Sequence, residues 1–273
     1  MNAKALIISG YGLNCEEETR YAFEYCGLEG SVIHINDLIE NPKLFDEYQV
    51  MAIPGGFSYG DDTGSGNAFA QKMKLALADH LYKFVERDTL LIGICNGCQI
   101  LANLGMVPAF DDSYGDRVVA VTYNASDRYQ CRWIDIKVNS NSPWLSGIDQ
   151  MHIPVAHGEG RFIMPDATFT KLESNGQIAA KYVNADGSPA NGEFPANPNG
   201  SVGDIAAISD RSGKVLAIMP HPERGMFTWQ RDDFDALKET ALRDGLELPE
   251  VADGIALFQN AADYFEVSKR KIA

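Results

Sequence analysis

The feature that most constrains the fold is an alternation, within the first hundred residues, of short apolar runs with longer segments of helical periodicity. The apolar runs predict four strands, at residues 5–9, 31–35, 50–53 and 90–94. Between them, residues 16–26 and 67–85 show the pattern of amphipathic helices. This order is typical of right-handed βαβ units, so we predict an α/β fold with a doubly wound, mostly parallel, flavodoxin-like sheet.

The second half of the chain has a different pattern. Polar and apolar residues alternate in four further strand candidates, at residues 132–138, 178–183, 204–209 and 214–219. Such alternation is typical of antiparallel strands, which we expect as additions to the sheet. Residues 184–201 are rich in Gly, Pro and Asn and predict a loop, and residues 254–265 predict a final helix. We expect one domain over residues 1–273.

Charge excludes one class of partner. The chain has 23 Lys and Arg against 38 Asp and Glu, a net charge of −15 at pH 7. A negative field of this size repels the phosphate backbone of nucleic acids. We therefore expect no nucleic-acid partner.

Apolar runs and cysteines indicate the compartment. No run approaches the roughly 20 apolar residues that span a bilayer, and the first run is too short for the core of a signal peptide. The five cysteines cannot all pair within one chain, and at 273 residues a domain does not need disulfides. These features favour reduced thiols and a cytoplasmic protein without membrane contact.

Cys95 is the strongest candidate for chemistry, because it lies between a predicted strand and a helical segment and has glycines nearby at 93 and 97. A side chain at that junction points from the carboxyl edge of a parallel sheet into the ligand crevice. The helix N-terminus there stabilises a thiolate or an oxyanion. A lone cysteine is more often a small core residue. The junction and its glycines favour a nucleophile instead.

Cys98 offers a competing interpretation, because Cys95 and Cys98 form a C-x-x-C pair. Such pairs occur in redox proteins and in zinc sites. Zinc would require two more ligands, and the chain has neither a second C-x-x-C nor an H-x3-H companion. We expect Cys98 to pack against the sheet and keep a redox pair as an alternative.

Gly55 and Gly56 follow the third predicted strand, which in a doubly wound sheet neighbours the strand before Cys95. Backbone amides of paired glycines are uncovered and can face a developing negative charge, although the pair by itself is also an ordinary turn. The following segment, residues 58–66, is rich in Gly, Ser and Asp. We expect a mobile interface loop there, whose Asp61 and Asp62 pair with cations of a partner, or else a plain solvated loop.

His221 is the candidate base. It follows the last predicted strand between two prolines, which fix the backbone, and Glu223 stands two residues further on. A carboxylate at that spacing can orient an imidazole and stabilise its cation. A lone histidine is usually structural, but together with a junction cysteine this pair predicts a base and its orienting group.

Three motifs together resemble the class I, or triad, glutamine amidotransferases. They are Gly55-Gly56-Phe57, the run from Gly93 to Gln99, and His221-Pro222-Glu223. Longer blocks at residues 56–61, 156–161, 197–201 and 219–224 resemble, more narrowly, the glutaminase components of phosphoribosylformylglycinamidine synthases of purine biosynthesis. The blocks run from the N-terminal region to about Arg224, and their joint occurrence is specific.

The resemblance implies a role for each matching residue. Cys95 would be the nucleophile, His221 the base and then the acid, and Glu223 the orienting group. Backbone near Gly55 or Gly56, together with Asn96, would supply oxyanion donors. The implied substrate-binding residues are Gly55, Gly56, Phe57, Asn96, Gln99, His157 and Gly158.

The resemblance also implies the reaction and the partners. Glutamine would be hydrolysed to glutamate and ammonia, and a separate ATP-dependent synthetase would use the ammonia to convert formylglycinamide ribonucleotide to formylglycinamidine ribonucleotide. A small bridging subunit is expected as well. No metal or cofactor is expected in this chain, and ATP and Mg²⁺ would bind the synthetase, in agreement with the absence of a P-loop motif here.

Three alternatives remain. The first is a glutaminase that serves a different synthetase, and the second is a redox module that uses Cys95 and Cys98. The third is a noncatalytic glutamine sensor or assembly subunit that keeps the fold. Glutamate release from glutamine, with and without a reductant, separates the redox module from a glutaminase.

Overall fold

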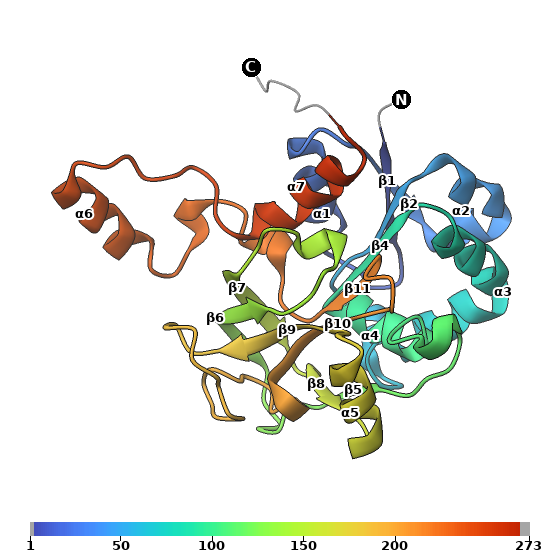
Figure 1. Ribbon diagram of the computed structural model, residues 1–273. Helices are drawn as coiled ribbons and strands as arrows, with labels where there is room; N and C mark the ends of the chain where they lie inside the picture. The colour runs from blue at the N-terminus through green and yellow to red at the C-terminus, as the bar shows by residue number, and fades with distance from the viewer. Residues whose placement is uncertain (1–2, 268–273) are drawn as a thin grey trace.

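A nine-stranded mixed sheet forms the centre of the molecule (Figure 1). The computed structural model describes residues 3–267. Five strands run parallel to one another, in the spatial order β2 (Glu29–His34), β1 (Lys4–Ser9), β3 (Val50–Ile53), β4 (Leu90–Ile94) and β11 (Val215–Ile218). Every residue of β3, β4 and β11 is buried, as expected for parallel strands covered on both faces.

The antiparallel strands continue the sheet beyond β11. They follow in the order β10 (Ile205–Ser209), β9 (Ile178–Val183), β6 (Gln130–Val138) and β7 (Gln150–His157). A separate two-stranded ribbon pairs β5 (Ala120–Thr122) with β8 (Arg161–Ile163). The predicted α/β fold, with a mostly parallel sheet and antiparallel additions, is therefore confirmed.

The helices are α1 (Glu16–Tyr25), α2 (Ile35–Glu40), α3 (Asn67–Glu86), α4 (Asn96–Leu104), α5 (Asp166–Ser174), α6 (Phe234–Asp244) and α7 (Gly254–Tyr264). Most of them flank the sheet, whereas α6 projects away from it (Figure 1). The predicted apolar stripe of α3 is buried, and α3 packs against α4. Helix α1 packs against α7, where the rings of Phe23 and Phe258 meet edge to face at 5.0 Å. No helix among residues 3–267 is long and apolar enough to cross a membrane.

The segment at residues 58–66 differs from the expected loop. It contains a short 3-10 turn, Ser58–Asp61, in which Tyr59 and Asp61 have positive φ angles of 54° and 57°. Ser58 and Ser65 are buried, and their backbone amides donate to Asn96 Oδ1 and Glu159 Oε2 at 3.2 and 3.3 Å. The segment is thus anchored at both ends to side chains, one of them next to Cys95 in the sequence, rather than fully solvated.

Candidate active site

Cys95 lies between the last residue of β4 and the first residue of α4, in a strained conformation. Its φ and ψ angles are 50° and −102°, a region that non-glycine residues avoid, and the residue is 4% exposed. The backbone is fixed there, because the Cys95 amide donates to Ile218 O at 2.8 Å. Strain of this kind is maintained only by surrounding packing, and it concentrates at functional sites.

Gly97 provides part of that packing. A Cβ atom added at Gly97 would lie 1.8 Å from the carbonyl oxygen of Ile53 at the end of β3. Helix α4 therefore lies directly against β3, which is possible only without a side chain at this position. The close contact places the first turn of α4 beside the Gly55 and Gly56 segment that follows β3.

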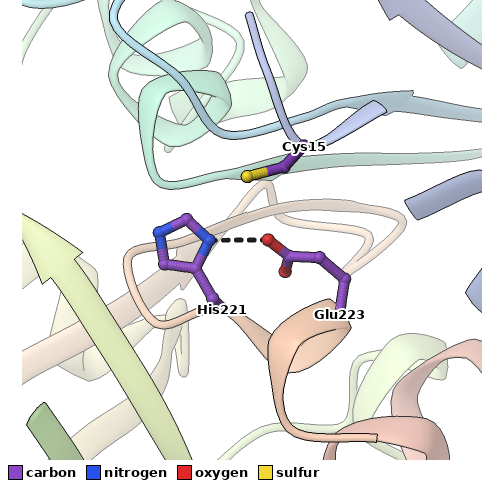
Figure 2. Close-up of side chains that lie close together, drawn as sticks. All are labelled: Cys15, His221 and Glu223. Carbon is purple, nitrogen blue, oxygen red and sulfur yellow. Dashed lines mark hydrogen bonds and ion pairs between the residues drawn. The ribbon is translucent and has the colours of Figure 1, made fainter. Parts of the chain in front are cut away.

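His221 follows β11 at the same edge of the sheet, and Glu223 follows it within a short 3-10 turn. The His221 Nδ1 atom lies 2.6 Å from Glu223 Oε1, as Figure 2 shows, and both side chains are buried. Burial opposes a charged imidazole, but the Glu223 carboxylate and then Cys95 oppose this effect, and the pKa of His221 is raised well above its usual value. The contact with Glu223 therefore favours the protonated imidazole of His221.

Cys15 is a third group beside this pair, and the sequence analysis did not identify it. Its Sγ atom and one ligand atom each of His221 and Glu223 lie within 4.8 Å of one another (Figure 2). Burial, the largest influence, raises the pKa of this thiol. Cys15 follows β1, the neighbour of β3, so its place at the carboxyl edge of the predicted sheet was a usable signal.

A cavity of about 260 Å³ opens onto Cys95 and His221. Its other lining residues come from several elements and are Asn14, Cys15, Glu18, Gly56, Phe57, Tyr129, Ala156 and Arg224. Gly55 lies beside this wall, since a Cβ there would be 2.7 Å from the Cε1 atom of His221. Glu18 and Arg224 supply one charge of each sign, a pattern that suits a zwitterionic amino acid.

Five of the seven expected substrate-binding residues do not line this cavity: Gly55, Asn96, Gln99, His157 and Gly158. Asn96 donates to Gln99 Oε1 at 2.7 Å, and the Gln99 amide donates to the carbonyl of Glu159. These two side chains form a buried network behind the nucleophile, and only the Asn96 backbone lies next to Cys95.

The His157 side chain is directed elsewhere. Its Nδ1 atom lies 3.0 Å from Asn124 Oδ1, and burial lowers the pKa of His157 to about 3, so the ring is neutral. Neighbouring Ala156, rather than His157, reaches the Cys95 thiol, with its carbonyl oxygen 3.7 Å from Cys95 Sγ. A carboxyl-edge position alone could not show which residue of this strand end faces the cavity.

Cys98 has the packing role that was expected. It is fully buried in α4, and burial, followed by the proximity of Cys95, raises the pKa of its thiol well above the usual value. A redox pair needs a reactive thiolate that exchange partners can reach. This environment counts against the redox alternative. Among residues 3–267, neither cluster with metal-binding geometry includes Cys98.

The site combines a strained junction cysteine with a histidine and carboxylate pair at the carboxyl edge of a doubly wound sheet, which defines a triad-type glutamine amidotransferase. Residues 2–265 match the family described as "CobB/CobQ-like glutamine amidotransferase domain", and the chain belongs to this family. The amidotransferase resemblance seen in the sequence is confirmed.

Individual relatives refine this classification. The chain is 46% identical to phosphoribosylformylglycinamidine synthase subunit PurQ of Methanococcus maripaludis, over 96% of this chain and 97% of the relative. It is 40% identical to the subunit of the same name from Dehalococcoides mccartyi, over 96% and 97% of the two chains. Among solved structures, PurLQS from Thermotoga maritima matches with a TM-score of 0.70 and 28% identity, covering 97% of this chain and all of that chain.

Proposed function

We propose that this chain is the glutaminase subunit of a phosphoribosylformylglycinamidine synthase, acting as a single cytoplasmic domain. Support for the particular synthase comes from the relatives of nearly equal length that have this name. The observation that carries the glutaminase activity is the opening of Cys95 and His221 onto one cavity, with Glu223 bonded to the far side of the imidazole.

The proposed chemistry uses two covalent steps. The Cys95 thiolate attacks the side-chain amide carbon of glutamine, and the resulting tetrahedral intermediate expels ammonia after His221 protonates the nitrogen. This step leaves a γ-glutamyl thioester on Cys95. His221 then removes a proton from water, whose attack on the thioester releases glutamate and restores the thiolate.

Backbone amides are the proposed oxyanion donors. The first N–H groups of α4, starting at Asn96, have no partner within the helix and lie next to the nucleophile. Gly56 also lines the cavity. One such donor typically contributes about 3 to 4 kcal/mol of transition-state stabilisation.

The charges of Glu18 and Arg224 support glutamine as the substrate. Both residues line the cavity that contains the thiol, and they can pair with the α-ammonium and α-carboxylate groups of an amino acid. In this proposal Asn96 and Gln99 act behind the wall of the cavity, where they position the first turn of α4.

Ammonia would pass to a synthetase subunit that binds ATP and Mg²⁺ and amidates formylglycinamide ribonucleotide, with a small bridging subunit completing the assembly. The solved relative from Thermotoga maritima is described as PurLQS, which supports a complex of this kind. This chain would then contribute nitrogen and need no cofactor of its own.

Isotopic labelling tests the proposal. The chain is combined with its purified synthetase and bridging subunits, ATP, Mg²⁺, formylglycinamide ribonucleotide and glutamine labelled with ¹⁵N in the side-chain amide. We expect the label in the amidine nitrogen of the product, at one label per glutamate released. Glutamate release without amidine labelling would support a glutaminase serving a different synthetase. No glutamate release would contradict the glutaminase itself.

A further inference from the structure

Residues 229–251, which we call the arm, project from the body of the molecule (Figure 1). Within the arm, α6 lies away from the sheet at the left of the view, whereas Asp232 near the base lies 3.0 Å from the Nε2 atom of His152 in β7. The base of the arm is closed by backbone hydrogen bonds, from Thr228 N to Glu250 O at 3.0 Å and from Ala252 N to Met226 O at 2.8 Å. The base is therefore fixed, and the helix extends from it.

The arm lacks the packing that normally stabilises a helix. None of the eleven residues of α6 is buried. Trp229, Leu242 and Leu246 are 64%, 68% and 66% exposed. Isolated helices shorter than about 12 to 15 residues are marginal in water, and most helices in proteins are stabilised by tertiary contacts. A surface outside this chain is therefore needed to cover α6.

Charge indicates what that surface is like. Residues 229–251 include seven acidic and three basic side chains. Arg231 pairs with Asp233, and Arg243 pairs with Glu239, so two of the cations are already neutralised. Asp244 and Glu247, on either side of the turn after α6, have no ion pair among residues 3–267. The arm thus presents leucines surrounded by uncompensated negative charge.

A second copy of this chain does not suit the arm. Each copy has a net charge of −15, so the two would repel each other. We propose that the arm is a docking element that inserts Leu242 and Leu246 into an apolar groove with a basic rim on the synthetase subunit. This inference rests on the proposed function for the identity of the partner.

The base of the arm is connected to the catalytic loop. Met226 is three residues after Glu223, and the Gly254 amide donates to Gly225 O at 3.0 Å. A Cβ at Gly254 would lie 2.1 Å from the carbonyl oxygen of Pro222, between His221 and Glu223. This contact leaves no free space, so a displacement at the base of the arm also shifts the backbone that carries His221 and Glu223. Docking at the arm therefore has a direct route to the active site.

Affinity measurements with a matched control test the arm. Binding of the synthetase and bridging subunits is measured for the wild type, for the double variant Leu242→Ala/Leu246→Ala, and for Leu75→Ala. Leu75 is 88% exposed on α3 and serves as the control for loss of an exposed leucine. We expect the double variant to bind at least tenfold more weakly, with Leu75→Ala within twofold of the wild type.

Two further measurements keep the outcomes distinct. Hydrogen exchange at residues 234–244 should slow at least tenfold when the synthetase is added, and higher salt should weaken the binding. Unchanged affinity of the double variant together with unchanged exchange would overturn the docking role while leaving the proposed function intact. Failure of the wild type to bind the synthetase would overturn both the docking role and the proposed function. If the wild type associates with itself and the double variant does not, the arm binds a second copy of this chain and the proposal is wrong.

Discussion

At the residue scale, the triad depends on how burial and charge are combined at His221. The ring is enclosed, yet the 2.6 Å contact between Nδ1 and Glu223 Oε1 stabilises its protonated form. Without the carboxylate, burial would favour the neutral ring. In the proposed mechanism the two residues make unequal contributions, because His221 moves the proton whereas Glu223 orients the ring and stabilises its charge.

Substitution separates these contributions. We expect His221→Asn to lower kcat/KM for glutamine hydrolysis by at least about 10³-fold, since the proton carrier is removed. Glu223→Gln should cause a smaller loss, because the imidazole remains. Steady-state glutamate release measures both, with Cys98→Ser as a control that keeps most of the activity. Equal kcat/KM values for His221→Asn and Glu223→Gln would contradict these roles.

Asp61 provides a pH-dependent prediction. Burial, the largest influence, raises its pKa from 3.8 to about 6. The folded chain therefore binds this proton more tightly than the unfolded chain, so its contribution to stability falls as pH rises from about 4 to 6 and stays low above 6. We expect Asp61→Asn to be more stable than the wild type at pH 8, by about 1 to 2 kcal/mol after allowance for partial exposure.

The measurement for Asp61 is the free energy of unfolding of both proteins at pH values from 4 to 8. The advantage of the variant should fall steadily from pH 6 toward pH 4, because the unfolded wild type begins to bind the proton only as the pH approaches its ordinary pKa of 3.8. A constant difference across this range would show that the ionisation of Asp61 is not its cause.

At the scale of elements, much of the fold could be predicted because the sequence pattern and the burial agree. The short, fully apolar runs at β3 and β4 are typical of parallel strands that are covered on both faces. The apolar stripe on α3 is typical of a helix that packs against such a sheet. The positions of Cys95 and His221 at strand ends then bring them to one edge of the sheet.

The parts that could not be predicted depend on side-chain direction and long-range contacts. Ala156 and His157 are the last two residues of β7, and the sequence pattern does not show which of them faces the thiol. In the structure, a contact with Asn124 holds the His157 ring away from it. The projection of the arm could not be predicted either. The periodicity of α6 is that of an ordinary packed helix, and it does not indicate which surface the helix packs against.

Gly97 tests the contact between α4 and β3. We expect Gly97→Ala to destabilise the fold by at least about 3 kcal/mol, because its Cβ would overlap the Ile53 carbonyl oxygen, and to abolish glutamine hydrolysis. Gly158→Ala is the control for stability, since its Cβ would have its nearest neighbour at 3.9 Å, an ordinary contact. Denaturant unfolding of the two variants measures the difference. Similar small losses in both would show that α4 can shift freely.

At the scale of the whole molecule, the site around Cys95 and His221 is connected to two outer segments, residues 58–66 and the arm. The segment at residues 58–66 is fixed to Asn96 behind the nucleophile, and the arm begins just after Glu223. Contacts with a partner at either segment can therefore alter the geometry around Cys95 and His221. A glutaminase that is active alone would release its ammonia to solvent.

We accordingly expect the isolated chain to be a poor glutaminase that the synthetase stimulates at least tenfold when loaded with ATP and formylglycinamide ribonucleotide. Glutamate release before and after addition of the loaded synthetase measures this stimulation, and the Leu242→Ala/Leu246→Ala variant should show less of it at limiting concentrations of partner. An isolated rate already equal to that of the complex would show that the site needs no ordering.

In the proposed synthase reaction this chain supplies only nitrogen, and it does so through Cys95. The most direct measurement compares amidine synthesis by the complex containing Cys95→Ala with glutamine or with added ammonium as the nitrogen source. We predict complete loss of glutamine-dependent synthesis and ammonia-dependent synthesis within twofold of the wild type. Equal loss of both activities, or retention of the glutamine-dependent activity, would contradict the account.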